Sequence, residues 1–208
     1  MINHPERIAA ILLAAGESTR MGRPKQLLHW AGRTLIDWQV GQLQHAGAAE
    51  IVVVLGHDAE SIRLAVPETA RVVVNEVYRE GRASSLRRGA EAIEEPVDAL
   101  LILGVDQPRP AWLSRRLVER WRETHALIVS PRFPSGFGHP ILVAGSLLPE
   151  LRAVDEASLG LRAVIDRHVA EAGSIDVESD AVDVDLNTPE DYQEALAAFQ
   201  SGDWATQL

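Results

Sequence analysis

LAAGESTRMGRPKQLL, residues 13–28, is the stretch that decides the fold, because an apolar strand breaks there into a loop. The run from Ile8 to Leu13 is continuously apolar, which is typical of a strand buried on both faces of a parallel sheet. The loop combines small residues and cations: Ala14, Ala15, Gly16, Arg20, Gly22, Arg23 and Lys25. Small residues let backbone N–H groups turn toward an anion, and the cations supply opposite charge. The stretch therefore predicts a site for nucleotide phosphates.

An ordinary loop is the alternative, since strand-to-helix connections are generally rich in small residues and surface cations. Two common nucleotide motifs are absent from the stretch. A Walker loop requires Gly-Lys followed by Ser or Thr, and a dinucleotide fingerprint requires glycines at G-x-G-x-x-G spacing. Any phosphate site here therefore belongs to another type.

Length and composition set the outer limits. With 208 residues, we expect one domain over residues 1–199 and a C-terminal tail over 200–208. The net charge of −10 argues against nucleic acid as a partner but permits a local phosphate site. The chain has no cysteine, so a metal must be held by oxygen or imidazole, and a cytoplasmic location is expected. No apolar stretch approaches the about 18 residues of a membrane span, and no export signal is evident.

Strand-like and helix-like segments alternate along most of the chain. Further strands are expected at 51–55, 71–74, 100–105, 127–130 and 141–143, and helices at 34–46, 84–93, 112–124, 147–151, 159–172 and from 189 onward. The expected N-caps are Asp58, Ser84 or Ser85, and Thr188, the last in a capping box with Asp191. This alternation predicts an α/β fold with a mainly parallel sheet, whose ligands bind beyond the carboxyl ends of the strands.

Polar residues follow two of these strands. Asp106 ends the run LLILGV, and Asn75 follows the strand at 71–74, so both should face the same crevice as the loop. Mg²⁺ needs only one or two protein oxygens when nucleotide phosphates and water supply the rest. Asp106 is therefore a candidate metal ligand. The alternative is that Asp106 only begins the turn before Pro108.

DVDLNTPED, residues 183–191, offers a second metal position. Asp183, Asp185 and Asn187 alternate, so in an extended segment their oxygen donors would project from one face. A helix cap with solvated carboxylates explains Thr188 and Asp191 but leaves the paired donors before them unexplained. Either Asp185 or Asn187 could be the closer ligand, since an amide oxygen coordinates Mg²⁺ without bringing charge.

NEVYREGRASSLRRG, residues 75–89, is a candidate for binding a nucleotide base. Small residues at Gly81, Ser84 and Ser85 would allow a base to approach, with main-chain groups and hydroxyls reading its edge. Arg87 and Arg88 fit a solvated helix face better than a site.

Several of these segments together resemble the molybdenum cofactor nucleotidyltransferase family, within the small NTP transferase superfamily. The loop is similar to the signature AAGxSxRMGxPKxLL. GVDQP at 104–108, the segment at 75–86 and DLNTPED at 185–191 resemble further family elements in the same order. GHP at 138–140 and SLGLRAVI at 158–165 are similar to the molybdopterin branch.

The resemblance implies a three-layer, Rossmann-like nucleotidyltransferase fold, with an NTP-binding half at about 1–110 and an acceptor-binding half at about 111–199. It implies a Mg²⁺-dependent enzyme that moves an NMP onto a phosphorylated acceptor and releases pyrophosphate. Ala14, Ala15 and Gly16 resemble the cytidylyl-transferring members more than the guanylyl-transferring ones, which favours CTP over GTP. The implied acceptor is molybdopterin, and a molybdoenzyme would receive the product.

The site residues that the resemblance implies fall into four groups. The catalytic residues are Arg20, Lys25 and Asp106. The NTP-binding residues are Leu13, Ala14, Ala15, Gly16, Ser18, Arg20, Met21, Gly22, Lys25, Asn75, Gly81, Ser84 and Ser85. The metal ligands are Asp106 with Asn187 or Asp185, and the acceptor-binding residues are His139 and Arg162. A structural histidine and a helix-surface cation are the alternatives for the last two.

Two other functions fit the same residues. One is the same transfer chemistry with a sugar phosphate or another small acceptor, against which the GHP and G-x-R elements argue. The other is a non-catalytic nucleotide-binding protein that delivers a cofactor to a partner enzyme. Release of pyrophosphate would separate an enzyme from such a binder.

Overall fold

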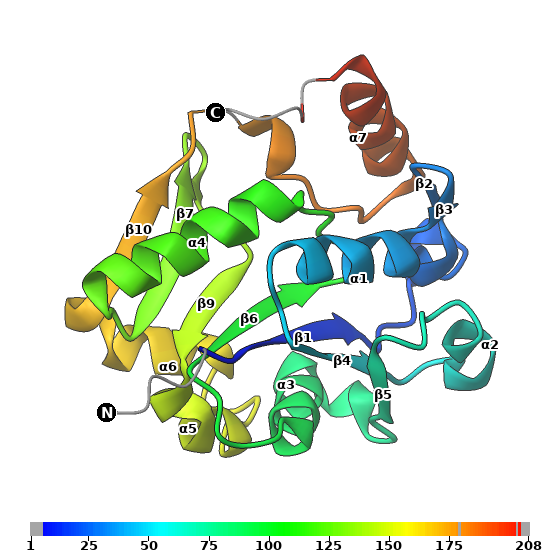
Figure 1. Ribbon diagram of the computed structural model, residues 1–208. Coiled ribbons are helices and arrows are strands. Elements are labelled where there is room, and N and C mark those ends of the chain that lie inside the picture. Colours follow the sequence, from blue (N-terminus) through cyan, green and yellow to red (C-terminus); the bar gives the residue numbers. More distant parts are fainter. Residues whose placement is uncertain (1–5, 179, 203, 205–208) are drawn as a thin grey trace.

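A mixed eight-stranded sheet runs through the centre of the molecule, with helices on both sides (Figure 1). The computed structural model describes residues 6–178, 180–202 and 204. The sheet order is β10-β7-β9-β6-β1-β4-β5, and β8 pairs with β7 outside this path. Its strands are β1 (Ile8–Ala14), β4 (Glu50–Leu55), β5 (Arg71–Val74), β6 (Ala99–Gly104), β7 (Ile128–Phe133), β8 (Gly136–Phe137), β9 (Ile141–Ala144) and β10 (Ala172–Asp176). β2 (His29–Trp30) and β3 (Arg33–Thr34) form a separate two-stranded sheet.

β1 lies at the middle of the sheet and pairs in parallel with β4 and β6. Ile11 is opposite both Val52 and Ile102, and all three side chains are buried. β9 is antiparallel and lies between β6 and β7, whereas β10 pairs with β7 in parallel. The predicted α/β fold with a mostly parallel sheet is therefore confirmed, and the carboxyl ends of β1 and β6 lie side by side.

Alternation along β1 divides the core between the two faces of the sheet. Ala10 and Leu12 face one cluster, which includes residues of α1, α4 and α7, while Ala9 and Ile11 face the other, with α3, α5 and α6. The helices are α1 (Leu35–His45), α2 (Ala59–Arg63), α3 (Arg82–Ala92), α4 (Ala111–Thr124), α5 (Leu148–Arg152), α6 (Leu161–Arg167) and α7 (Pro189–Ser201). Figure 1 shows α1 and α4 over one face and α3 and α5 over the other. Within the described residues, no helix has both the length and the apolarity to cross a bilayer.

α7 is held against the core by an aromatic cluster. Trp30 packs at 5.3 Å between ring centroids from both Phe199 and Trp204. The predicted capping box is present, because Thr188 accepts from the Asp191 amide and Asp191 accepts from the Thr188 amide. α7 runs to Ser201, and of the expected tail Trp204 packs into the core at 4% exposure. Residues 203 and 205–208 lie outside the described residues.

Two local predictions were wrong. The helix expected at 159–172 spans only Leu161–Arg167 and is followed by a 3-10 turn at Val169–Glu171. The strand β10 at Ala172–Asp176, whose backbone pairs with β7, was not predicted. α3 begins at Arg82, so Ser84 and Ser85 lie inside its first turn rather than at its cap. Asp58 occupies the predicted N-cap position of α2, but with a left-handed φ of 49° its side chain makes no capping hydrogen bond. Its carboxylate accepts from the Ser61 hydroxyl instead.

Candidate active site

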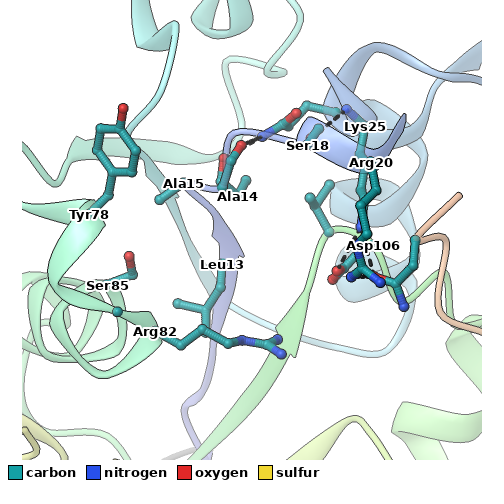
Figure 2. Close-up of a pocket in the computed structure, with 15 residues that line it drawn as sticks. Leu13, Ala14, Ala15, Ser18, Arg20, Lys25, Tyr78, Arg82, Ser85 and Asp106 are labelled. Carbon is teal, nitrogen blue, oxygen red and sulfur yellow. Dashed lines mark hydrogen bonds and ion pairs between the residues drawn. The ribbon is translucent and has the colours of Figure 1, made fainter. Parts of the chain in front are cut away.

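A cavity of about 360 Å³ opens where β1 and β6 end, and we call it the nucleotide cavity (Figure 2). It gathers most of the residues that the sequence singled out: Leu13, Ala14, Ala15, Gly16, Ser18, Arg20, Lys25, Gly81, Ser85, Asp106 and Asn187. Tyr78 and Ser85 lie on one side of the cavity, whereas Arg20, Lys25 and Asp106 lie on the other (Figure 2). Arg20, Lys25 and Asp106 are therefore grouped on one side of the cavity, whereas Arg82 starts from α3 on the side of Ser85.

The loop after β1 is folded tightly by its own side chains. Ser18 takes a left-handed conformation with φ of 56°, and its hydroxyl accepts a 3.1 Å hydrogen bond from the Lys25 amide. The amide group of Gln26, which is 1% exposed, donates to the Ala14 carbonyl at 2.6 Å. These two contacts fix the path of the loop and direct the Lys25 side chain into the cavity.

Lys25 joins the two candidate metal ligands. Its ammonium donates to Asp106 Oδ2 at 3.3 Å and to Asn187 Oδ1 at 3.0 Å, and Arg20 also donates to Asn187 Oδ1, at 3.1 Å. These residues come from three distant parts of the chain. Two oxygens that already share one cation form a donor set suited to a divalent ion that takes its remaining ligands from phosphates and water. The geometry therefore fits a Mg²⁺ held by Asp106 and Asn187.

Asp183, Asp185 and Asn187 do not face one site, contrary to the alternation in the sequence. The segment is irregular rather than extended strand, so the period of two does not apply. Asp185 accepts from Gln107 at 3.1 Å and is not part of the nucleotide cavity, while Asp183 pairs with Arg109. Across the described part of the chain, no group of three or more acidic, histidine or cysteine side chains is placed to hold a metal. Asn187 is thus the residue that the structure brings to Asp106.

Four of the sequence-predicted NTP-binding residues do not line the cavity: Met21, Gly22, Asn75 and Ser84. Met21 packs into the core at 4% exposure. Gly22 follows it and ends the short 3-10 turn Thr19–Met21 with a φ of 71°. Asn75 is buried and donates to the hydroxyls of Ser84 and Ser85 at 2.9 and 3.0 Å. Asn75 and Ser84 therefore position Ser85 and the start of α3.

A second cavity of about 280 Å³ adjoins the first, and we call it the acceptor cavity. It contains both His139 and Arg162, and it shares Leu13 and Arg82 with the nucleotide cavity. The side chain of Arg162 is 78% exposed and lies 3.7 Å from Asp166. The sequence-predicted acceptor residues thus come together, next to the residues predicted to bind the NTP.

His139 is neutral at physiological pH. Burial lowers its pKa to about 4, and the nearby charges of Arg82 and Arg109 act in the same direction. Its Nδ1 lies 3.1 Å from the side-chain amide nitrogen of Gln107. Because that nitrogen can only donate, Nδ1 accepts and the ring proton resides on Nε2. His139 can therefore offer one hydrogen-bond donor to a ligand.

Arg109 is a residue that the sequence reasoning missed. It is 1% exposed and donates to Asp183 Oδ1 at 2.9 Å, to the Val184 carbonyl at 2.6 Å and to the His139 carbonyl at 2.9 Å. Burial lowers the pKa of Arg109, and the charge of Asp183 opposes that shift. Its only sequence signal is its place three residues after Asp106. Arg109 ties the loop after β6 to the segment that carries Asn187.

Tyr78 is a second residue that the sequence did not indicate, and it lines the nucleotide cavity on the side of Ser85. Its hydroxyl donates to Glu17 at 3.1 Å, and Glu17 accepts from Arg79 at 2.8 Å. The hydrogen bond from Arg79 lowers the pKa of Glu17, so this carboxylate is charged. No pattern in the sequence around Tyr78 indicated that its ring would line this cavity.

The fold and the paired cavities define a nucleotidyltransferase-type α/β enzyme. The chain belongs to the MobA-like NTP transferase domain family, whose model matches residues 10–172. Nicotine blue oxidoreductase of Paenarthrobacter nicotinovorans is 30% identical over 201 residues, which cover 91% of this chain and 96% of that protein. The chain is also 32% identical over 160 residues to the bifunctional protein GlmU of Azorhizobium caulinodans, of which the match spans only 35%.

Solved structures show the same architecture. Rv0371c of Mycobacterium tuberculosis is 26% identical, with a TM-score of 0.78 over 92% of this chain and 98% of that one, and it is also known in complex with manganese. A nucleotidyl transferase from Methanothermobacter is 25% identical, with a TM-score of 0.79 over 95% of this chain and 99% of that one. The CTP complex of CMP:2-keto-3-deoxy-manno-octonic acid synthetase is similar in fold, with a TM-score of 0.75 at 15% identity.

Proposed function

We infer that this enzyme transfers CMP from CTP to a phosphorylated acceptor and releases pyrophosphate. The acceptor that we propose is molybdopterin. The observation that carries the proposal is the contact of Lys25 with Asp106 and Asn187, at the mouth of a small-residue loop and beside a second cavity. This arrangement places cations where a triphosphate would lie and leaves space for a second substrate beside it. The proposed setting is the cytoplasm, with a molybdoenzyme receiving the product.

The protein's part in the reaction is mainly alignment and charge neutralisation. The amides between Ala14 and Gly22 hold the triphosphate, and Arg20 and Lys25 neutralise its charge. An oxygen of the acceptor phosphate attacks the α-phosphorus, and the bond to the β-phosphate oxygen breaks. Pyrophosphate leaves with the electron pair of that bond. Because the acceptor phosphate is itself nucleophilic, no covalent intermediate with the enzyme is needed.

Asp106 and Asn187 would hold Mg²⁺, which when bound supplies positive charge to the phosphates. The manganese complex of Rv0371c supports a divalent ion in this family. Asn187 is favoured over Asp185 as the second ligand, since Asp185 is turned toward Gln107.

The two substrates are assigned to the two cavities. The cytosine is expected near Gly81 and Ser85, where main-chain groups and a hydroxyl line the nucleotide cavity. The acceptor is expected near His139 and Arg162, which line the second cavity. GTP in place of CTP, or a sugar phosphate in place of molybdopterin, would use the same geometry.

A pyrophosphate-release assay tests the proposal. Each of the four NTPs is incubated with the enzyme and Mg²⁺, with and without molybdopterin. We expect release only with CTP and molybdopterin together. Release with GTP would move the proposal to guanylyl transfer, and release with a sugar phosphate would replace the acceptor. Binding of nucleotides without release under any acceptor would instead support a delivery protein.

A redox activity is the second candidate, because the P. nicotinovorans relative is named an oxidoreductase and matches over almost its full length. The same preparation is therefore assayed for oxidation of NADH and NADPH with quinone-like dyes. We expect no oxidation above the rate without enzyme. Rapid oxidation together with absent pyrophosphate release would favour the redox function.

A further inference from the structure

Arg82 occupies the junction of the two cavities. It is the first residue of α3, and its side chain lines both the nucleotide cavity and the acceptor cavity. Figure 2 shows the side chain extending from α3 alongside Leu13. A single side chain at this place can touch ligands in both spaces.

The room for this side chain comes from Gly104, the last residue of β6. A Cβ atom at Gly104 would lie 3.0 Å from a guanidinium nitrogen of Arg82 and 2.4 Å from Asp106 Oδ1. The side chains of Arg82 and Asp106 therefore both occupy space next to Gly104 that a side chain there would fill. On the acceptor side, the charge of Arg82 lowers the pKa of His139. The guanidinium thus lies between the candidate metal ligand and the candidate acceptor ligand.

The charge of Arg82 is not neutralised by a contact. Among residues 6–178, 180–202 and 204, none forms a hydrogen bond or ion pair with its guanidinium. Its neighbours on α3 differ: Arg87 donates to the Val154 carbonyl at 3.3 Å, and Arg88 donates to the Val74 carbonyl and lies 3.6 Å from Glu91. The other cations of the nucleotide cavity, Lys25 and Arg20, already hold Asn187. A guanidinium that has no partner among the described residues is suited to a planar oxyanion contact.

We propose that Arg82 binds the α-phosphate of the NTP and the attacking anionic group of the acceptor at the same time. This inference rests on the proposed nucleotidyl transfer and specifies its acceptor as a compound that presents a phosphate monoester at the junction. As the new phosphorus–oxygen bond forms and the bond to pyrophosphate breaks, negative charge from both substrates meets at the α-phosphorus. Arg82 offsets that charge and reduces the repulsion between the two anions.

Two measurements on the full chain test the proposal, with Arg82→Ala, Arg82→Lys and Arg88→Ala as variants. The first is calorimetric binding of α,β-methylene CTP with Mg²⁺, which requires no acceptor and no turnover. The second is pyrophosphate release with CTP and molybdopterin. Arg88→Ala is the matched control, because it removes an exposed cation from the same helix without touching either cavity.

We expect Arg82→Ala to weaken binding of the analogue about tenfold and to slow pyrophosphate release by roughly 10²–10³-fold, since the loss then includes the acceptor contact. Arg82→Lys should recover part of both losses, and Arg88→Ala should stay within about twofold of wild type. If Arg82→Ala behaves like Arg88→Ala in either the binding or the pyrophosphate-release measurement, the proposal that Arg82 contacts both substrates is wrong. If wild type binds the analogue but releases no pyrophosphate with any acceptor, the proposed function fails, while the binding comparison still decides whether Arg82 contacts the nucleotide.

Discussion

The two cavities are built in different ways. In the nucleotide cavity, the charged groups are already joined, because Lys25 connects Asp106 and Asn187 and the loop is held by Ser18 and Gln26. In the acceptor cavity, Arg162 is 78% exposed, and apolar side chains such as Leu86 and Leu161 form much of the wall. The comparison teaches that the charged groups of the nucleotide cavity are preorganised, whereas the second cavity, to which we assign the acceptor, is a more open and more apolar surface.

The largest expected effect is at the preorganised centre. Lys25→Ala and Asp106→Ala should each reduce pyrophosphate release by at least about 10³-fold, because they remove charge placed for the transition state. Arg23→Ala is the matched control: Arg23 belongs to the same loop but stacks at 5.5 Å on the Tyr192 ring, outside the cavity. It should retain activity within about threefold. Circular dichroism checks that all three variants fold, and near-normal turnover of either centre variant would refute their assignment.

The next prediction concerns the contacts of Arg109, which hold the segment that carries Asn187 beside Lys25. Arg109→Met leaves Asp183 without its buried partner, and we expect the free energy of unfolding to fall by about 3 kcal/mol in urea titrations. Arg120→Met, an exposed change on α4, should alter it by less than about 0.5 kcal/mol. Equal stability of the two variants would show that Arg109 does not anchor the 183–187 segment.

A pair of substitutions distinguishes the two candidate metal ligands. Asn187→Ala should lower turnover by roughly 10–100-fold and raise the Mg²⁺ concentration needed for half-maximal rate, since Asn187 lies beside Lys25. Asp185→Ala should remain within about threefold, because Asp185 contacts Gln107 instead. The measurement is a Mg²⁺ titration of pyrophosphate release. A larger loss in Asp185→Ala would reverse the assignment.

The last prediction concerns pH and the acceptor cavity. Burial holds the pKa of His139 at about 4 in the folded chain, against 6.5 when it is exposed. Between these values the unfolded chain binds a proton that the folded chain does not, so stability falls as pH drops from 6.5 toward 4, with a slope of at most about 1.4 kcal/mol per pH unit. His139→Gln should reduce this slope in urea titrations from pH 4 to 7.5. Identical slopes in both proteins would show that His139 is not a buried neutral group.

The sequence predicted those parts of the site that depend on local patterns. The loop at residues 13–28 was recognisable because its small residues and cations are adjacent in the chain, and Asp106 because it ends an apolar run. Arg109 was not predictable in this way. Its buried position depends on Asp183 and on the His139 carbonyl, which come from other parts of the chain. β10 was missed for a similar reason, since its sequence AGSID has no apolar run that indicates a strand and its strand conformation depends on pairing with β7.

The sequence by itself determined the α/β alternation, the loop of small residues and cations after β1 and the set of residues from which a site could be made, because these depend on neighbours in the chain. Only the tertiary structure decided that Asn187 rather than Asp185 reaches Lys25, and that Arg82 lies between two cavities. The physical reason is that side-chain contacts of this kind depend on how distant segments pack. α7 is placed by its aromatic cluster, and the path of residues 183–187 follows from that placement and from Arg109.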